Sequence, residues 1–402
     1  MSQDHVRRPS APFAAMPDLA SRRLGGSVVA ASNELFAERE NLIKAESPVF
    51  TPSTFGHKGQ VYDGWETRRR REPGNDWALV RLGIPGAIRG VIVDTAFFTG
   101  NYPPEVSIEA AGVAGYPSPE ELLGADWTTI VARTPVNGDS LNEFAVQVLG
   151  RFTHVRLVMY PDGGIARLRV HGEPVPDPRI LAGTDLDLAA LANGGWITGC
   201  SNTFYSSPFN LIAPGSPRAM GEGWETARRR DDGNDWVEIR LCGPSVLHRA
   251  EIDTSYFLGN APGWAALSGW HAADGHAAPV ELMPRTRLQP DIVHMLPVNP
   301  HAEVTHVRVD IFPDGGLARV RLHGTLASAA REQVALRWFN LIPADEAITV
   351  LRDTLGADFD PAAAAALIAL RPLSNLDTLP LALKAQMETQ GVGPSGSVEH
   401  HL

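Results

Sequence analysis

Two near-identical peptides place carboxylates, arginines and asparagines side by side: GWETRRRREPGNDW at 64–77 and GWETARRRDDGNDW at 223–236. An arginine side chain presents a planar fork of N–H groups that binds a carboxylate through two hydrogen bonds. Neighbouring carboxyl groups can transfer protons as general acid and general base. The peptides therefore indicate a site for a small anion, with four candidate acid or base residues: Glu66, Asp76, Glu225 and Asp235.

A packing role is the alternative interpretation of the same peptides. Tryptophan is usually buried, so we interpret the four tryptophans as core residues: Trp65, Trp77, Trp224 and Trp236. A run of arginines usually lies on a solvated face. Asn75 and Asn234 occupy predicted GND turns, where asparagine often bonds nearby backbone. Asn101 and Asn260 lie in a second repeated turn, and both interpretations are open for them.

The sequence predicts neither a metal site nor a nucleotide cofactor. Four histidines recur in pairs within predicted strands, and we interpret them as structural residues: His154 with His306, and His171 with His323. HExxH, HxH and CxxC spacings are missing, so no ligand set for a metal is indicated. No P-loop, no GxGxxG after a strand and no serine nucleophile elbow occurs.

The surroundings of these peptides are duplicated as well. VDTAFFTGNYP at 93–103 corresponds to IDTSYFLGNAP at 252–262, and THVRLVMYPDGGIARLRVHG at 153–172 corresponds to THVRVDIFPDGGLARVRLHG at 305–324. Copies of this length fit two homologous domains better than the short units of a solenoid. The first copy has additional loop residues, including TPSTFGHKGQ at 51–60.

Each copy has the pattern of short β-strands separated by Gly and Pro turns, which favours a β-sandwich. PDGG between two alternating segments predicts a β-hairpin in each copy. Helix formers with acidic first turns predict a helical C-terminal segment. The predicted boundaries are 1–172 for the first repeat, 173–186 for a proline-rich linker, 187–330 for the second repeat and 331–402 for the helical extension.

Composition limits the class of protein further. The chain has 402 residues, a formal net charge of -11 and two cysteines. An acidic chain is poorly suited to binding nucleic acid. The sequence contains neither an apolar stretch of membrane-spanning length nor the apolar region of a signal peptide. We therefore expect a soluble cytoplasmic protein that binds neither nucleic acid nor membrane.

The repeated peptides, with DGWETRRRREPGNDW and YPDGGIARLRVHGEPVP among them, resemble those of the allantoicase family (allantoate amidinohydrolases) from Asp18 to Gly324. The resemblance implies an all-β fold of two tandem jelly-roll domains of the galactose-binding-like type, followed here by a short helical tail. It also implies a homo-oligomer that hydrolyses allantoate to ureidoglycolate and urea in purine breakdown.

Allantoate is a carbon atom bearing one carboxylate, one hydrogen and two ureido groups. On this resemblance, its carboxylate would be held by arginines of the two repeats, Arg68, Arg69, Arg228 and Arg229. The candidate carboxylates named above would supply acid and base. The ureido groups would bind the amides of Asn75, Asn101, Asn234 and Asn260. A divalent metal would help this reaction without being required, and the longer loops favour the first repeat as the active one.

Two other classes of function are open. Jelly-roll domains of lectin-like proteins bind sugars without catalysing a reaction. A degenerate allantoicase could instead serve as a structural or regulatory subunit. Sugar binding without ureide turnover would favour the first class, and the lack of both activities would favour the second.

Overall fold

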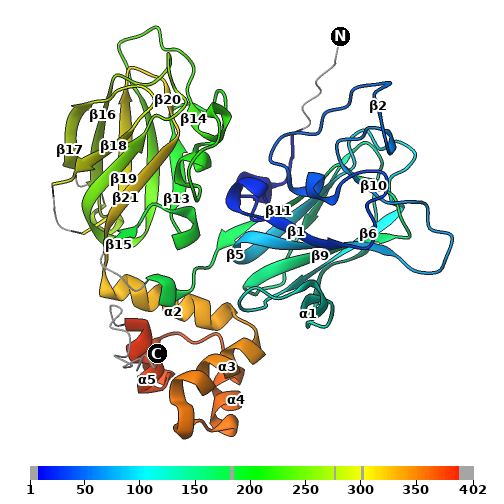
Figure 1. Cartoon of the computed structure of the whole chain (residues 1–402). Coiled ribbons are helices and arrows are strands. Elements are labelled where there is room, and N and C mark those ends of the chain that lie inside the picture. The colour runs from blue at the N-terminus through cyan, green and yellow to red at the C-terminus, as the bar shows by residue number, and fades with distance from the viewer. Residues whose placement is uncertain (1–7, 182–184, 276–277, 300–302, 389–402) are drawn as a thin grey trace, which may run out of the picture. The chain divides into compact units, whose positions relative to one another are not determined.

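The computed structural model describes residues 8–181, 185–275, 278–299 and 303–388. Contacts within the chain divide it into two compact units (Figure 1). The first comprises the residues up to Val175 together with Leu341–Glu346. The second comprises Pro176–Asn340 and the residues from Ala347 onward. Each unit contains one copy of the sequence repeat.

The first unit is a β-sandwich built around one long strand, β5 (Asp76–Asp94). The first half of β5 pairs with β9 (Phe152–Tyr160), and its second half pairs with β11 (Arg167–Pro174) and β8 (Leu141–Ala145). The ladder with β9 is interrupted after Arg81. This interruption lets one strand contribute to both layers of the sandwich.

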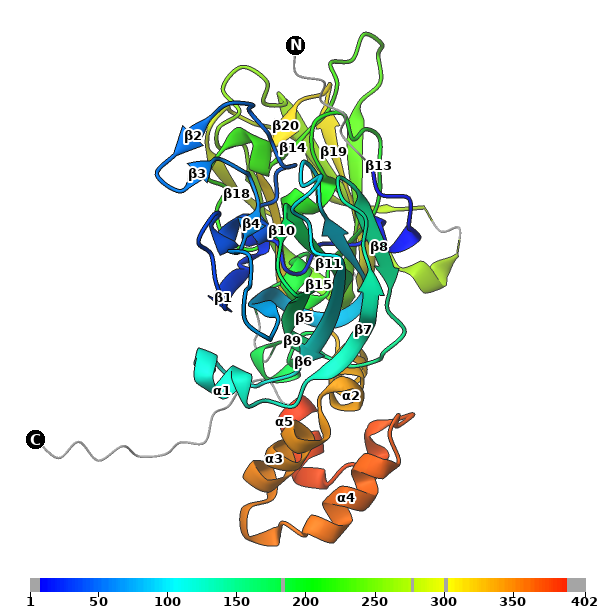
Figure 2. The ribbon, with the colours of Figure 1, turned by 90° about the vertical axis from the view of Figure 1, so that its right-hand side faces the viewer.

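The other strands of this unit extend the layers or form short pairs at their ends. They are β1 (Ser27–Ala31), β2 (Phe55–Gly56), β3 (Gly59–Gln60), β4 (Trp65–Glu66), β6 (Glu105–Ala111), β7 (Thr128–Pro135) and β10 (Gly164–Ile165), with one short helix, α1 (Pro119–Leu123). Figure 2 shows β2 and β3 as a small hairpin, formed by the extra loop residues of the first copy. The pair β4–β10 is separate from the main sheet.

The second unit repeats this architecture around β15 (Asp235–Asp253). Its other strands are β12 (Leu186–Asp187), β13 (Trp196–Cys200), β14 (Trp224–Glu225), β16 (Trp264–Trp270), β17 (Val280–Arg287), β18 (Val293–Pro297), β19 (Val304–Phe312), β20 (Gly316–Leu317) and β21 (Arg319–Leu326). β15 pairs with β19 through its first half and with β21 and β18 through its second half. The two units confirm the predicted tandem jelly-roll β-sandwiches.

Alternation of buried and exposed side chains explains which residues form the core. In the second halves of β9 and β19 every second residue is fully buried, namely Val155, Leu157, Met159, Val307, Val309 and Ile311. Trp65 and Trp224 are also fully buried, as predicted. Trp77 and Trp236 are only half-buried, so the prediction of four core tryptophans was wrong for these two. Each is the second residue of its long strand and lies on the face opposite the buried residues beside it.

The predicted PDGG hairpins were also wrong. β9 pairs with β5 and β6, whereas β11 pairs with β5, and these two fully described strands do not pair with each other. The PDGG turn therefore connects the two layers of the sandwich instead of two neighbouring strands. Its residues pair with β4 through Gly164 and Ile165, which places this turn beside the candidate site.

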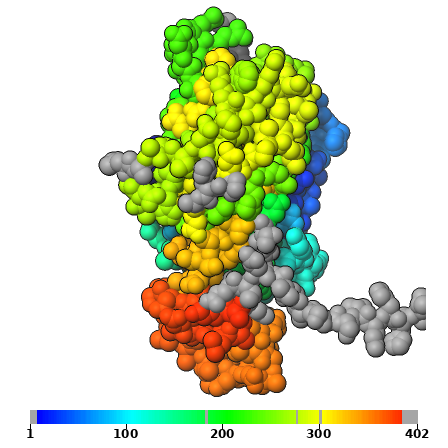
Figure 3. Space-filling model, turned by 90° about the vertical axis from the view of Figure 1, so that its left-hand side faces the viewer, coloured from blue at the N-terminus to red at the C-terminus, as the bar shows by residue number. Residues whose placement is uncertain are grey.

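The C-terminal segment is helical, as predicted, and begins within the second unit at α2 (Ser328–Leu341). It continues through α3 (Ala344–Leu355), α4 (Pro361–Ala369) and α5 (Leu381–Glu388). Asp360 caps α4 by accepting the backbone N–H of Ala362, and Pro361 is the first helical residue. Figure 3 shows the side chains of these helices in orange and red. Among the described helices, none is long and apolar enough to cross a membrane.

His154 of β9 is a buried histidine whose titration affects stability. Only 2% of it is exposed, and its Nδ1 lies 2.8 Å from the hydroxyl oxygen of Thr153. Burial, reinforced by the charge of Arg81, lowers the pKa of His154 from 6.5 to about 4. A lowered pKa in the folded state means that protonation favours unfolding.

We therefore predict a loss of about 2–3 kcal/mol in the free energy of unfolding as pH falls from the unfolded pKa of His154 towards its folded pKa. The stabilisation is complete above the unfolded value and is lost on acidification. His154→Gln should remove most of this pH dependence in urea titrations. His306→Gln, at the equivalent position, is the comparison. Burial lowers the pKa of His306 as well, but this side chain is more exposed, so the variant should remove a smaller part of the pH dependence. Identical acid profiles for wild type and His154→Gln would contradict the prediction.

Candidate active site

The short pair β4–β10 holds Glu66 against the PDGG turn of the first unit. Glu66 is the register partner of Gly164. A side chain at position 164 would approach the Phe98 ring to 2.1 Å, so only glycine fits there. Trp65, the neighbour of Glu66, is anchored below the strand by its indole N–H, which donates to the Asn33 carbonyl at 2.8 Å. Buried neighbours thus fix the backbone that presents Glu66.

Glu66 forms its side-chain contact with Asn101. The Asn101 amide donates to Oε1 of Glu66 at 2.7 Å, and the Asn101 carbonyl accepts the N–H of Gly164 at 2.7 Å. Burial raises the pKa of the Glu66 carboxyl above its ordinary value, and the hydrogen bond from Asn101 partly opposes this shift. A half-buried carboxyl group with a raised pKa is suited to donating a proton.

The second unit contains the same pair. The Asn260 amide donates to Oε1 of Glu225 at 2.7 Å, and the Asn260 carbonyl accepts the N–H of Gly316 at 2.9 Å. Glu225 lies on β14, whose register partner is β20. All four residues of these Glu–Asn pairs are among the predicted site residues, and in each unit the structure brings the two members together.

Asp76, the first residue of β5, is paired with an arginine. Its Oδ1 accepts hydrogen bonds from Nη1 of Arg70 at 2.7 Å and from the hydroxyl of Ser32 at 3.0 Å. Its Oδ2 is buried and has no hydrogen-bond partner within the described chain. The backbone N–H of Arg70 donates to Oδ2 of Asp162 at 2.7 Å, so the PDGG turn also fixes this arginine.

Asp235 of the second unit has the equivalent partners. Its Oδ1 accepts from Nη1 of Arg229 at 2.7 Å and from the hydroxyl of Ser201 at 2.8 Å. The N–H of Arg229 donates to Oδ2 of Asp314 at 2.7 Å. Arg229 also forms an ion pair with Asp231, Nε to Oδ1, at 2.9 Å. The buried Oδ2 of Asp235 likewise has no partner in the described residues.

The structure separates the remaining predicted residues from these pairs. Arg68, Arg69 and Arg228 are exposed at the surface. The described contacts of Arg68 include a hydrogen bond from its backbone N–H to the Asn33 side chain at 3.0 Å. Asn75 is exposed as well. Among the predicted arginines, only Arg229 reaches a predicted carboxylate.

Asn75 and Asn234 differ although they occupy equivalent positions. Asn234 is half-buried, and its amide donates to Oδ1 of Asp310 at 2.8 Å and to the carbonyl of Asp235 at 3.0 Å. Asp310 also accepts from Nε of Arg308 at 3.1 Å. In the second unit Asn234 thus hydrogen-bonds the beginning of β15 and a residue of β19. These contacts support a structural role for Asn234 in the turn.

Three residues of this site were not predicted from the sequence: Arg70, Asp162, which binds the backbone N–H of Arg70, and Ser32, which donates to Asp76. The repeat contained part of the signal. When the two peptides are superposed, Arg68 falls opposite Ala227, which argues against Arg68. The superposition does not distinguish Arg70 from Arg69 and Arg71, because all three fall opposite an arginine of the second copy.

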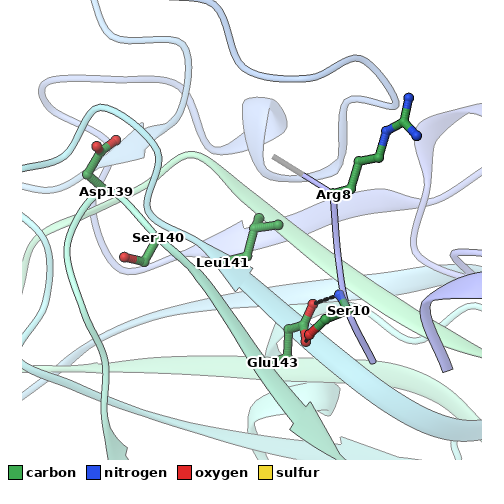
Figure 4. A pocket seen from close by; sticks show the side chains of 6 residues that line it. All are labelled: Arg8, Ser10, Asp139, Ser140, Leu141 and Glu143. Carbon is green, nitrogen blue, oxygen red and sulfur yellow. Dashed lines mark hydrogen bonds between the residues drawn. The ribbon is translucent and has the colours of Figure 1, made fainter. Parts of the chain in front are cut away.

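A pocket of about 410 Å³ lies in the first unit (Figure 4). Its lining residues are Arg8, Ser10, Asp139, Ser140, Leu141 and Glu143. Both oxygens of the Glu143 carboxylate accept hydrogen bonds from Ser10, at 2.7 Å from its N–H and 2.8 Å from its hydroxyl. The Glu143 carboxylate that lines this pocket thus already binds the chain through both of its oxygens. We therefore place the candidate active site at the Glu–Asn and Arg–Asp pairs.

No group of three or more His, Cys, Asp or Glu side chains in the described part of the chain is arranged to hold a metal ion.

Two β-sandwiches of one architecture, each with the same Glu–Asn and Arg–Asp pairs, define a duplicated jelly-roll protein with a polar site in each copy. The family model described as "Allantoicase repeat" matches residues 17–175 and 186–327. The chain belongs to the allantoicase family.

Relatives along most of the chain agree with this assignment. A probable allantoicase of Nocardia farcinica is 58% identical over 317 residues, covering 78% of this chain and 95% of that relative. One of Streptomyces coelicolor is 54% identical over 341 residues, covering 81% and 90%. The crystal structure of allantoicase from Saccharomyces cerevisiae has a TM-score of 0.67 at 36% identity, covering 77% of this chain and 92% of that one. A purely sugar-binding function is not favoured.

Proposed function

We propose that this protein hydrolyses allantoate to ureidoglycolate and urea in purine breakdown. The observation that supports the proposal most directly is the hydrogen-bonded pair of Glu66 and Asn101, in which burial raises the pKa of the carboxyl group. The same PDGG turn that pairs with Glu66 also fixes Arg70. An acid, an amide and a cation therefore lie around one turn, as a substrate with ureido groups and a carboxylate requires.

The reaction needs one proton donor that later becomes a proton acceptor. The protonated Glu66 carboxyl gives its proton to the departing urea nitrogen while the bond from that nitrogen to the central carbon breaks. The nitrogen of the second ureido group supplies the electron pair, so a cationic acylimine forms. Water then adds to the central carbon and gives its proton to the Glu66 carboxylate, which restores the acid. Allantoate and water are consumed, and ureidoglycolate and urea are formed.

The other residues have proposed roles in binding. Asn101 hydrogen-bonds a ureido group while it orients Glu66. In the first unit the carboxylate of the substrate binds the guanidinium group of Arg70, and in the second unit it binds that of Arg229. The exposed Arg68, Arg69 and Arg228 add positive charge to the peptides of their own units. Asp76 and Asp235 were predicted as acid or base. Their burial and their ion pairs support a positioning role instead, in which each one orients its arginine.

The experiment that tests the function is urea release from allantoate by the purified protein. The protein should be treated with a chelator first, and the assay should be run with and without added divalent metal. We expect rapid urea release together with formation of ureidoglycolate. A folded protein that releases no urea under any of these conditions would eliminate the proposed activity.

We also propose that the protein is a cytoplasmic homo-oligomer. Cys200 and Cys242 are free thiols in the structure, as expected in a reducing compartment. Burial raises the pKa of the Cys242 thiol to about 12, which keeps it protonated and unreactive. Light scattering of the purified chain would measure the number of subunits, and a mass equal to one chain would contradict the oligomer.

A further inference from the structure

Each unit holds one aromatic residue in a backbone conformation that aromatic residues rarely adopt. Phe97 has a φ of 68° and Tyr256 has a φ of 70°. The left-handed region brings Cβ close to the backbone, so glycine and asparagine are the residues usually found there. Such strain persists only where surrounding contacts enforce it, and it is concentrated at functional sites.

In the first unit a carboxylate enforces the conformation. The N–H of Phe97 donates to Oδ1 of Asp139 at 2.8 Å. The N–H of Asp139 donates to the carbonyls of Thr95 and Phe98, both at 3.1 Å. The Thr95 hydroxyl donates to the Asn137 carbonyl at 2.6 Å. These bonds clamp the turn from both sides.

The second unit has the same clamp built from equivalent residues. The N–H of Tyr256 donates to Oδ1 of Asp291 at 2.7 Å. The N–H of Asp291 donates to the Thr254 carbonyl at 3.2 Å, and the Thr254 hydroxyl donates to the Gln289 carbonyl at 2.7 Å. The turn is thus kept in both copies with an aromatic residue at the strained position.

The strained residues do not serve the hydrophobic core. Phe97 is 39% exposed and Tyr256 is 46% exposed, whereas the next residues, Phe98 and Phe257, are buried. In each turn it is therefore the second aromatic residue, Phe98 or Phe257, that packs in the hydrophobic core. The first one presents its ring outward, at a position where glycine would satisfy the backbone with less strain.

The two rings lie close in the chain to the Glu–Asn pairs. Asn101 follows Phe97 closely in the same loop, and its side-chain amide donates a hydrogen bond to Glu66. The Phe98 ring packs under Gly164, the partner of Glu66 in the β4–β10 pair. The same buried ring thus supports the strand of Glu66 and the loop that presents Phe97.

Aromatic stacking joins Phe97 to this support. The ring of Phe97 stacks on Phe50 with centroids 5.6 Å apart, Phe50 stacks on Tyr62 at 5.4 Å, and Tyr62 stacks on Phe98 at 5.1 Å. Phe97 is thus the exposed end of a row of stacked rings whose other end, Phe98, packs at Gly164, the register partner of Glu66.

We propose that Phe97 and Tyr256 are the aromatic wall of the substrate site in their respective units, against which a planar ureido group stacks. This inference rests on the proposed function. A ureido group is flat and conjugated, so its edge can bind the amide of Asn101 or Asn260 while its face packs on a ring. A ring held by a clamped turn loses little conformational entropy when the substrate binds.

The test uses variants of Phe97 and Tyr256 that remove the aromatic ring, keep it, or remove it and also relieve the backbone strain. We expect Phe97→Ala or Tyr256→Ala, whichever lies in the active repeat, to raise KM for allantoate by roughly tenfold with a smaller change in kcat, and the double variant to show at least this effect. Phe97→Tyr and Tyr256→Phe keep an aromatic ring and should stay within about twofold of wild type. Thermal unfolding of every variant separates loss of binding from loss of fold.

The glycine variants decide between the wall and a purely structural turn. Phe97→Gly/Tyr256→Gly relieves the strain and removes both rings, including the stacking of Phe97 on Phe50, so the two effects on stability oppose each other. The variant should still fold and should have a raised KM. Unchanged kcat/KM in this variant would overturn the proposal. If wild type itself releases no urea, the proposed function fails. Calorimetry with N-carbamoylglycine, a carboxylate with one ureido group, then tests the wall: weaker binding to the glycine variant supports it, and equal affinity overturns it.

Discussion

Glu66→Gln is expected to lower kcat of the first repeat for urea release by about 10²–10⁴-fold, the usual contribution of a general acid or base. Glutamine keeps the size of the side chain and can still bind the Asn101 amide through its oxygen, but it cannot donate the proton that the departing urea needs. KM should change little because the substrate carboxylate is held elsewhere. The measurement is steady-state urea release at saturating allantoate.

Stability provides the control for this variant. Burial raises the pKa of Glu66 in the folded state, so the folded protein favours the protonated form and loses stability as pH rises through that pKa. Replacing the carboxyl with a neutral amide removes this loss. Glu66→Gln should therefore unfold at the same temperature as wild type or a higher one near neutral pH. A drop in melting temperature would mean that activity was lost through misfolding.

Glu225→Gln is the matched variant in the second unit, where Asn260 makes the same 2.7 Å contact. If the first repeat is the active one, Glu225→Gln keeps most of the activity. If both repeats are active, each single variant keeps about half of kcat and only the double variant is inactive. Full urea release by the double variant would remove both glutamates from the mechanism.

Wild-type activity should also decline as pH rises through the raised pKa of Glu66, because the acid is then ionised before the substrate arrives. The residual activity of Glu66→Gln should lack this decline. The pH dependence of kcat/KM reports the free enzyme and is the appropriate measurement. An identical alkaline decline in the variant would assign it to another group.

Much of the fold could be predicted from the sequence because a duplicated chain shows its own pattern twice. The repeated Glu66 and Asn101 could be named for the same reason, and the structure joins them although they belong to different segments. The PDGG hairpin could not be predicted correctly. A Pro-Asp-Gly turn is compatible with neighbouring strands and also with a connection between layers, and only the pairing of β5 with both β9 and β11 decides.

Residue types alone could not predict which arginine forms the ion pair with Asp76. Four consecutive arginines, 68–71, differ only in the direction that the loop gives to each side chain. That direction depends on Asp162, which lies far along the chain and binds the backbone N–H of Arg70. Gly74, with a φ of 131°, lets the loop turn back towards β5. Long-range contacts of this kind are set by the assembled fold.

Arg70→Met is expected to lower the free energy of unfolding by about 3–5 kcal/mol, because it leaves a buried carboxylate without its counter-charge. Asp76 is 1% exposed, and only Ser32 would still donate a hydrogen bond to it. Arg229→Met should change the stability of the second unit in the same direction, because it removes the 2.7 Å ion pair with the buried Asp235. The exposed Arg69→Met is the control and should stay within about 0.5 kcal/mol of wild type. Urea titrations measure all three.

The double variant Arg70→Met/Asp76→Leu separates the stabilising role of this pair from its role in binding. An apolar pair of similar volume can replace a buried ion pair with little loss, so most of the stability should return. Affinity for allantoate should not return, since the guanidinium that binds its carboxylate is gone, and KM should stay raised about tenfold or more. Recovery of both stability and KM would show that the Arg70–Asp76 pair only holds the loop. Recovery of stability alone would show that Arg70 also binds the substrate, and that the buried Asp76 orients the guanidinium group for this contact.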